Sequence, residues 1–280
     1  MKIGFIGQGW IGKNYANDFE NRGIDIVRYS LEEPYINNKE QLKECDIILV
    51  AVPTPSTQDG FDNSILIKAI KNNTYPGQTI VIKSTVQIGT TNVIQSLFVD
   101  RYIIHSPEFL TEKTAAYDAA NPSRNIIGCT MKSFCKANDV LNVLPKAPYN
   151  KICNCRDAEF VKYMGNCWFY FKVLSMNLFY DIAKDKNLDF DLMKEMLGAD
   201  KRVGDTHLDV EHQGGRGAGG HCFIKDFAAL KEMYINMDSC KGNYNTFGDE
   251  LIRAAESYNK SLLFKSGKSL DLLEGVYGKE

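Results

Sequence analysis

The sequence predicts an α/β fold in which a doubly wound, mostly parallel sheet is followed by an all-helical domain. Short apolar segments alternate with helical patterns through the first half of the chain, an alternation typical of strand–helix–strand units. From Asp157 to Lys186 the chain then follows one long helical pattern without proline and with a single glycine, Gly165. Such a helix, with helical patterns after it, indicates a second domain built from helices.

Six segments of the first half have the composition of strands. Most are β-branched and apolar along their whole length, as strands covered on both faces of a sheet are. Between them, the patterns at 13–22 and 90–98 suit helices. The expected strands are KIGFI (2–6), IDIVRY (24–29), DIILVAV (46–52), QTIVIKS (78–84), RYIIHS (101–106) and RNIIGC (124–129).

The second half is expected to be helical. Further helical patterns lie at about 190–198, 226–236 and 247–264, and the residues that follow resemble a loose tail. The expected parts are therefore a first domain at 1–154, a helical domain at 155–264 and a C-terminal tail at 265–280. Apolar residues of the long helix recur every three or four positions and predict a buried stripe, formed by Phe160, Met164, Cys167, Phe171, Leu174 and Leu178.

The composition fits a globular protein without nucleic-acid or membrane partners. The 280 residues carry a formal net charge of -2 and are 44% hydrophobic, which gives no electrostatic reason to expect nucleic acid or an anionic membrane. The N-terminus MKIGFIGQGW has no long apolar core, and no apolar run reaches spanning length. The eight cysteines are expected to be reduced thiols of a cytoplasmic protein, and their spacing predicts no metal site.

A glycine motif lies directly after the first expected strand. Residues 7–12, GQGWIG, fit the pattern G-x-G-x-x-G and open a helical pattern. In that context the glycines permit a tight turn and bring a pyrophosphate to the free N–H groups of the helix N-terminus. A glycine turn without a ligand is the alternative. The context favours a Rossmann-type dinucleotide-binding domain.

The end of the second strand bears on the choice between NAD and NADP. A carboxylate at this position accepts a hydrogen bond from the ribose 2′-OH of NAD, but the expected position is Ser30, in VRYSLEE. A serine does not repel a 2′-phosphate, whereas the nearby Glu32 and Glu33 would. NAD is the favoured cofactor.

Polar residues follow three other strands at the edge where such sheets bind ligands. They are the segments 53–55 (PTP), 83–85 (KST) and 106–108 (SPE). Glu112 lies four residues beyond Glu108, so a helical turn would place both carboxylates on one face. Each of these residues alone suits a helix cap or a solvated charge. Their shared edge favours a binding site.

Polar residues of the long helix form a second candidate group. Glu159, Lys162, Asn166 and Tyr170 recur at spacings of three and four and form a polar stripe. A buried lysine one turn from an asparagine can donate hydrogen bonds to an oxyanion or hold a substrate hydroxyl. A salt-bridged Glu159–Lys162 pair beside a structural asparagine is the alternative.

Cys222 follows a glycine-rich loop, GGRGAGG at 214–220. Glycines allow the backbone to approach a ligand closely. Lys225 and Asp226 are expected to open the next helix, with Cys222 just ahead of its N-terminus, where a thiolate is favoured. A nucleophilic cysteine and an inert, buried one are both compatible with these residues.

Five segments resemble the UDP-glucose/GDP-mannose dehydrogenase family in order and spacing, within a similarity that covers about residues 2–262. They are AVPTP (51–55), KSTVQIGTT (83–91), SPEFLTEKTAAYDAANPSRNIIG (106–128), AEFVKYMGN (158–166) and GAGGHCFIKD (217–226). The resemblance implies oxidation of the primary alcohol of a nucleoside-diphosphate sugar to a carboxylate, with reduction of two NAD. A homodimer through the long helix is predicted separately, because the aromatic faces of that helix exceed what one small domain could cover.

The resemblance also implies roles for single residues. Cys222 would capture the aldehyde as a thiohemiacetal, which a second hydride transfer turns into a thioester. Lys162 and Asn166 would stabilise the oxyanion, and Asp226 would position water or act as a base. Thr85, Glu108 and Glu112 match residues that manage water and protons. The cofactor contacts expected are Gly7, Gly9, Trp10, Ile11, Gly12, Ser30, Val52, Pro53, Thr54, Ser84, Thr85 and Glu112, and the substrate contacts are Glu108, Phe109, Leu110, Lys162, Asn166, Arg202, Gly219 and Lys225.

The sequence departs from the family at three places. His221 stands where the family usually has serine, Ser30 replaces an acid, and the family's C-terminal nucleotide-sugar-binding domain does not follow residue 264. Arg202 matches an arginine that contacts the nucleotide across a dimer interface. Two alternatives remain: a β-hydroxyacid dehydrogenase, which also carries Lys-x-x-x-Asn on its long helix and reduces one NAD per substrate, and a catalytically degenerate relative that binds a nucleotide.

Overall fold

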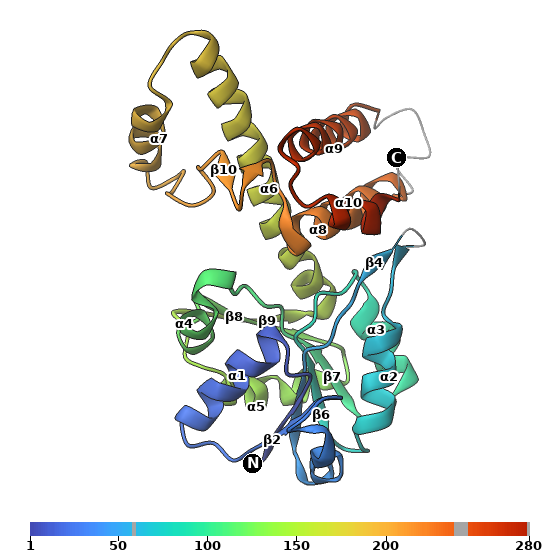
Figure 1. The fold of residues 1–280 in the computed structure, drawn as a ribbon. Coiled ribbons are helices and arrows are strands. Elements are labelled where there is room, and N and C mark those ends of the chain that lie inside the picture. Colours follow the sequence, from blue (N-terminus) through green and yellow to red (C-terminus); the bar gives the residue numbers. More distant parts are fainter. Residues whose placement is uncertain (58–59, 238–245, 279–280) are drawn as a thin grey trace. The chain divides into compact units, whose positions relative to one another are not determined.

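The computed structural model describes residues 1–57, 60–237 and 246–278, without the side chains of Thr57, Glu112, His221 and Thr246. The chain divides into two compact units (Figure 1). The first unit contains Met1–Pro55 and Phe61–Lys162, and the second contains Ser56–Gly60 and Tyr163–Glu280. The expected fold class, a Rossmann-type sheet followed by a helical domain, is confirmed.

The first unit is built on a seven-stranded sheet with the order β2-β1-β3-β6-β7-β8-β9. All neighbouring strands are parallel except β7 and β8, which are antiparallel. The six expected strands are confirmed, and β9 is an additional one. Because β9 is a polar edge strand with largely exposed side chains, it lacks the apolar run that marks the others. The strands are β1 (Ile3–Ile6), β2 (Ile26–Tyr29), β3 (Ile47–Val50), β6 (Thr79–Ile82), β7 (Tyr102–His105), β8 (Arg124–Cys129) and β9 (Tyr149–Asn154).

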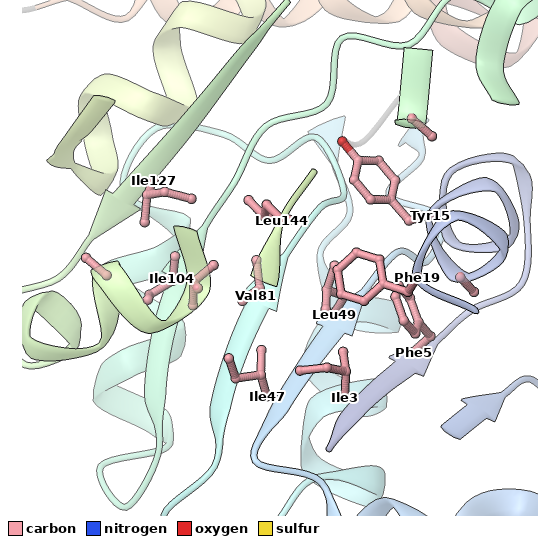
Figure 2. Packing of buried hydrophobic residues seen from close by; sticks show 14 of the residues in the cluster. Ile3, Phe5, Tyr15, Phe19, Ile47, Leu49, Val81, Ile104, Ile127 and Leu144 are labelled. Atoms are coloured by element: carbon pink, nitrogen blue, oxygen red, sulfur yellow. The ribbon is translucent and has the colours of Figure 1, made fainter. Parts of the chain in front are cut away.

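Helices cover both faces of the sheet (Figure 1). On one face lie α1 (Trp10–Asn21), α4 (Ala115–Ala120) and α5 (Ala137–Val143); on the other lie η1 (Ile36–Glu44), α2 (Ser64–Asn73) and α3 (Thr90–Leu97). Figure 2 shows the first of these two cores, where Phe5 and Phe19 meet edge to face at 5.2 Å. The short elements β4 (Ser56–Thr57), β5 (Gly60–Phe61), η2 (Glu112–Thr114) and η3 (Ser133–Lys136) complete the part of the chain before β9.

The register of the parallel strands places their carboxyl ends level with one another. Ile6 pairs with both Tyr29 and Val50, and Val50 pairs with Ile82, which in turn pairs with His105. The residues that follow these strands therefore share one edge of the sheet, as ligand-binding residues of such sheets do.

The second unit consists mainly of helices. They are α6 (Cys155–Asp185), which begins in the first unit, α7 (Phe190–Gly198), α8 (Gly220–Ile235), α9 (Thr246–Ser266) and α10 (Leu270–Tyr277). The stacked rings of Tyr170 and Phe227, 3.8 Å apart, join α6 to α8 at its centre. A two-stranded antiparallel ribbon, β10 (Glu211–His212) with β11 (Gly215–Arg216), interrupts the helices. This unit is thus not entirely helical.

The buried stripe of α6 differs from the expected one. Phe160, Met164 and Leu178 are 36%, 55% and 50% exposed, so half of the predicted stripe is wrong. The buried stripe instead contains Tyr163, Cys167, Tyr170, Leu174 and Asn177. The residues of this stripe also recur every three or four positions. Because large apolar residues occur on several faces of α6, the sequence alone does not distinguish the two stripes.

The end of the chain forms a helix where a loose tail was expected. In α10, Leu273 is 3% exposed and packs in a cluster with Ile224 of α8 and Leu263 of α9. Leu272, Val276 and Tyr277 of α10 pack against the same cluster, so several apolar side chains together hold this short helix against α8 and α9. Among the described residues, no helix is long and apolar enough to cross a membrane, and no group of three potential metal ligands occurs.

Candidate functional site

The three glycines of the motif at 7–12 have different surroundings. A Cβ atom on Gly7 would lie 2.2 Å from the carbonyl oxygen of Ala51, and one on Gly12 would lie 2.0 Å from that of Gly7. A Cβ on Gly9 would have no atom within 4 Å. Gly7 and Gly12 therefore permit close packing of the turn, while Gly9 opens onto space that a ligand can fill.

The helix after this turn presents unpaired donors. Gly9 caps α1 without a side-chain hydrogen bond, and no acidic residue lies in the first turn. Trp10, the first helical residue, is 57% exposed, and Ile11 packs on the core. The N–H groups and the dipole at this end favour an anion. The turn and the helix thus fit the pyrophosphate of a dinucleotide.

Ser30 at the end of β2 uses its hydroxyl locally. Its Oγ donates to the carbonyl of Glu32 at 2.7 Å and accepts from the N–H of Glu32 at 3.2 Å. The guanidinium of Arg28, also on β2, is bound by both carboxylate oxygens of Glu20, at 2.9 and 2.5 Å. Because Glu20 neutralises Arg28, this arginine is not available for a 2′-phosphate, and the surroundings favour NAD.

Hydroxyl groups join the loops after β3 and β6. Ser84 Oγ donates to the Val52 carbonyl at 2.7 Å and accepts from the Val52 N–H at 3.0 Å. Thr54 Oγ1 donates to the carbonyl of Thr85 at 2.7 Å. Pro53 is exposed and Thr85 half-buried at this edge. The hydroxyls of Ser84 and Thr54 therefore act as scaffold, holding the expected cofactor-binding loops together.

The carboxylate of Glu108 is buried, 7% exposed, and folds back on its own loop. Its Oε1 accepts from the N–H groups of Phe109 at 2.7 Å and Leu110 at 3.1 Å, and its Oε2 lies 2.9 Å from Lys83 Nζ. Burial acts to raise the pKa of Glu108, but the charge of Lys83 and hydrogen bonds from Tyr15, Lys83 and Phe109 outweigh it, so the pKa is lowered. Glu108 is thus an ionised anchor of the loop.

Lys83 and Tyr15 are the buried neighbours of the Glu108 carboxylate. Lys83 Nζ lies 3.3 Å from the Tyr15 hydroxyl and 3.3 Å from Ser106 Oγ. Burial, and then the charge of Glu108, raise the pKa of Tyr15. In Figure 2 the Tyr15 hydroxyl points away from the apolar core. Lys83 belongs to the polar segment 83–85 that the sequence predicts at this edge, but its pairing with Glu108 and the part played by Tyr15 were not predicted. The available signal was a lysine at the end of an apolar strand, since a buried lysine requires a partner.

Two cations lie against the ring of Phe109. The guanidinium carbon of Arg124 is 3.8 Å from the ring centroid, and Lys162 Nζ is 5.6 Å from it. Burial lowers the pKa of Arg124. Since the Glu108 carboxylate is turned into the loop, the surroundings of Phe109 are electropositive and suit an anionic or oxyanionic group.

Glu159 does not pair with Lys162. Its carboxylate accepts from the N–H groups of Gly89 at 2.6 Å and Thr91 at 2.7 Å, and from the Thr91 hydroxyl at 2.6 Å. It thereby caps the N-terminus of α3, although burial raises its pKa. The salt-bridge alternative for the polar stripe is wrong because the helix N-terminus supplies better donors.

No helical turn joins Glu108 to Glu112. Residues 107–111 are not helical, and Thr111 has an extended backbone with φ -100° and ψ 147°. The expectation of one shared helix face is therefore wrong. The side chain of Glu112 lies outside the described part of the structure, as does that of His221.

The glycine loop is an ordered turn followed directly by α8. Gln213 and Gly214, with φ of 51° and 82°, connect β10 to β11. Because α8 begins at Gly220, Cys222 lies inside its first turn, not ahead of the helix as expected. Cys222 is exposed. The first turn of a helix carries free N–H groups and the positive end of the helix dipole, which favour an anionic group bound there.

Asp226 lies one turn after Cys222 and is 1% exposed. Asn166 Nδ2 of α6 donates to Asp226 Oδ2 at 2.5 Å. Cys167 Sγ approaches the carbonyl of Asp226 at 3.7 Å, so the two helices are in direct contact here. The second unit thus brings together two of the expected catalytic residues, next to the turn that carries a third.

The remaining expected substrate residues lie at different places in the second unit. Arg202 has a side chain 90% exposed and forms an ion pair of 2.7 Å with Asp200. Lys225 is half-buried within α8. A Cβ on Gly219 would lie 2.8 Å from both Lys268 Cε and Ser269 Oγ, so glycine is required there by packing.

Two domain models of one protein family match the chain. The model for the NAD binding domain of the UDP-glucose/GDP-mannose dehydrogenase family matches residues 34–141, and the model for its central domain matches residues 156–260. UDP-glucose 6-dehydrogenase YwqF of Bacillus subtilis is 29% identical over 264 residues, which are 90% of this chain and 56% of that protein. UDP-glucose 6-dehydrogenase of Campylobacter jejuni is 30% identical over 274 residues, 85% of this chain and 69% of that protein.

Solved structures show the same fold. A UDP-glucose dehydrogenase from Pyrobaculum islandicum superposes with a TM-score of 0.79 at 24% identity, covering 98% of this chain and 70% of that one. The 3-hydroxyisobutyrate dehydrogenase of Mycobacterium tuberculosis superposes with a TM-score of 0.72 at 12% identity, covering 96% and 95%. The fold is therefore shared by both groups of enzymes, whereas the domain models and the sequence identities distinguish them. The chain belongs to the UDP-glucose/GDP-mannose dehydrogenase family.

Proposed function

We propose that the protein oxidises the primary alcohol of a nucleoside-diphosphate sugar to the uronate, with reduction of two NAD. The observation that carries the proposal is the Asn166–Asp226 hydrogen bond one helical turn from the exposed Cys222. A nucleophile at a helix N-terminus beside an oriented carboxylate is what acyl-transfer chemistry requires. Family membership supplies the substrate class.

Cys222 would divide the oxidation into two stages. The alcohol loses its hydroxyl proton and is oxidised to an aldehyde, and the Cys222 thiolate then forms a C–S bond to the aldehyde carbon. Lys162 and the second N–H of the Asn166 amide would donate to the resulting oxyanion. The second oxidation leaves a thioester on Cys222.

Asp226 would act in hydrolysis. A water molecule attacks the thioester carbonyl and gives a proton to Asp226, the C–S bond breaks, and Cys222 leaves as thiolate. Asn166 holds one oxygen of the Asp226 carboxylate at 2.5 Å, which would fix the direction in which the carboxylate accepts the proton. The chain thereby consumes one water per carboxylate formed.

The first unit would hold the cofactor. The turn at Gly7–Gly12 and the N-terminus of α1 would bind the pyrophosphate, and the loops that Ser84 and Thr54 join would line the nicotinamide half. Bound NAD would supply the electron acceptor for both oxidations. The cations Lys162 and Arg124 around Phe109 would keep this edge attractive to an anionic substrate.

The protein is also proposed to form a homodimer through α6 and α7. Apolar side chains of these helices are exposed together, which is unusual for a monomer surface. A second copy of the chain would cover them and would bring Arg202 to the nucleotide. The exposed apolar residues include, with their exposed fractions, Trp168 (66%), Phe179 (49%), Ile182 (58%), Leu192 (52%) and Met196 (60%).

A single-oxidation β-hydroxyacid dehydrogenase is the second candidate, because the 3-hydroxyisobutyrate dehydrogenase fold covers nearly the whole chain. The stoichiometry of NADH separates the two. A panel of UDP- and GDP-sugars should yield two NADH per sugar consumed, and Cys222→Ser should abolish acid formation, while Cys135→Ser, which removes another exposed thiol, should not. One NADH per substrate, or turnover of hydroxyacids alone, would overturn the proposal.

A further inference from the structure

Side chains from the end of α9 hold the backbone of the glycine loop. Asn259 contacts Ala218 twice: its Oδ1 accepts from the Ala218 N–H at 2.7 Å and its Nδ2 donates to the Ala218 carbonyl at 2.9 Å. Ser266 Oγ accepts from the N–H of Arg216 at 2.9 Å. Residues far along the chain thus satisfy backbone groups that a glycine-rich loop cannot satisfy itself.

Lys268 is the central member of this group. It is 7% exposed, and its Nζ donates to the carbonyl oxygens of Gly215 at 3.2 Å and Gly217 at 2.9 Å. Burial lowers its pKa. Among the described residues no carboxylate pairs with Lys268, so loop carbonyls alone solvate the ammonium group. Burying a lysine without a counter-charge is costly, which indicates that the contact has a use beyond stability.

The next residue contacts the helix that carries Cys222. Ser269 Oγ accepts from the N–H of Gly220, the first residue of α8, at 3.2 Å. A side chain at Gly219 would collide with both Lys268 and Ser269. The glycine there is therefore matched to these two side chains, and together the three residues define where α8 begins.

The segment that supplies these contacts is itself fixed at both ends. α9 precedes it, and α10 follows it with Leu273 buried against Ile224 and Leu263. Ile224 lies on α8 two residues after Cys222. The backbone that carries Lys268 is thus held in place on both sides, and a residue that positions a reactive side chain needs such support.

We propose that Lys268 is a positioning residue for Cys222: by holding the carbonyls of Gly215 and Gly217 it fixes the first turn of α8 and the direction of the thiol. The inference rests on the proposed function insofar as Cys222 is the nucleophile. A loop with glycines at 214, 215, 217, 219 and 220 has little stiffness of its own. Without the ammonium group the turn would sample positions from which Cys222 cannot attack.

The test compares Lys268→Met with Lys268→Arg. Lys265→Met is a matched control, because Lys265 is exposed near the end of α9, three residues before Lys268. Alkylation of Cys222 by iodoacetamide is followed by peptide mass spectrometry from pH 5 to 9, with Cys135 as internal reference. We expect Lys268→Met to shift the pH midpoint of Cys222 alkylation upward and to lower kcat about tenfold to a hundredfold, as small misplacements of a reacting group do. Lys268→Arg should keep the alkylation midpoint and kcat closer to the wild-type values than Lys268→Met does. Lys265→Met should change neither the midpoint nor kcat.

An unchanged alkylation profile together with unchanged kcat in Lys268→Met would overturn the proposal. If Lys268→Met does not fold, Ser269→Ala is used instead, because it keeps the lysine but removes the acceptor for the Gly220 N–H. An unchanged pH profile of Cys222 alkylation in Ser269→Ala would also contradict the proposal. Failure of the proposed function looks different. In that case no nucleotide sugar yields NADH with the wild-type protein, while the alkylation profile still responds to Lys268.

Discussion

The amide of Asn166 on α6 and the carboxylate of Asp226 on α8 are joined by a hydrogen bond of 2.5 Å. Asp226 is almost fully buried, and its backbone is approached by Cys167 from the same helix as Asn166. The carboxylate therefore cannot turn freely, and its orientation relative to the first turn of α8 is set by packing. This geometry suits a base that must accept a proton from one direction.

The first prediction concerns Asp226. Asn at this position keeps the shape and the bond to Asn166 but cannot accept a proton, so Asp226→Asn should lower the rate of acid formation about 10²- to 10⁴-fold. Because the loss falls on hydrolysis, an adduct on Cys222 should accumulate and be visible by intact-protein mass spectrometry after rapid quenching. Asp271→Asn, an exposed residue of α10, is the control. Wild-type turnover in Asp226→Asn would show that another group is the base.

Sequence patterns predicted the elements whose residues carry their own signal. Uniformly apolar strands and the long α6 are examples, because burial of a whole segment leaves a pattern along it. β9 was not predicted because it is a polar edge strand. α10 was not predicted because its helix is stabilised by contacts of Leu273 with Ile224 and Leu263. Such contacts are between distant segments and have no local pattern.

The same limit applies to the site. Cys222, Asn166 and Asp226 lie in motifs, so sequence could nominate them. Lys83 and Lys268 act through partners far away in sequence, Glu108 and the glycine loop, and a lysine on its own suggests a solvated charge. The alternative of a Glu159–Lys162 salt bridge came from their spacing on one helix, whereas the partners of Glu159 lie at the N-terminus of α3.

The second prediction concerns the buried Lys83–Glu108 pair. Lys83→Met leaves an uncompensated carboxylate, so the free energy of unfolding should fall by about 3–5 kcal/mol. Lys83→Met combined with Glu108→Gln should lose less, since no buried charge remains. Urea unfolding measures both. Lys2→Met, which removes a surface pair with Glu44, should cost much less, because solvent screens exposed ion pairs. Equal losses in Lys83→Met and Lys2→Met would contradict a buried pair.

The same pair predicts a pH dependence. The pKa of Glu108 is lowered in the folded protein, so its contribution to stability is fully present above the unfolded value of about 4.3 and is lost as the pH falls through the folded pKa. Glu108→Gln should therefore unfold with a shallower loss of stability on the acid side than the wild type. Parallel acid limbs for the two proteins would exclude this role.

The third prediction concerns cofactor choice. Glu20 neutralises Arg28, and Ser30 is engaged with Glu32, so the wild type should use NAD in preference to NADP. Ser30→Asp adds the carboxylate that a ribose 2′-OH binds and should lower the KM for NAD while raising that for NADP. Ser96→Asp, an exposed position on α3, should change neither. Improved use of NADP in Ser30→Asp would mean that the ribose lies elsewhere.

The fourth prediction concerns the exposed faces of α6 and α7. Trp168 is 66% and Phe179 49% exposed, so a charge at either position should disfavour a dimer without disturbing the fold of one chain. Sedimentation velocity at micromolar concentration should show a dimer for the wild type and a monomer for Trp168→Glu with Phe179→Glu. Tyr117→Glu, at a residue of the first unit that is 68% exposed, should remain dimeric.

Activity provides a second measurement of the same assembly. If a partner's Arg202 contacts the nucleotide, Trp168→Glu with Phe179→Glu should raise the KM for the sugar nucleotide as Arg202→Met does, and combining all three changes should add little, because the arginine has already been withdrawn. The KM for NAD should stay near the wild-type value, since the turn at Gly7–Gly12 belongs to the first unit. A wild-type protein that sediments as a monomer yet loses substrate affinity on Arg202→Met would instead place that arginine within its own chain's site.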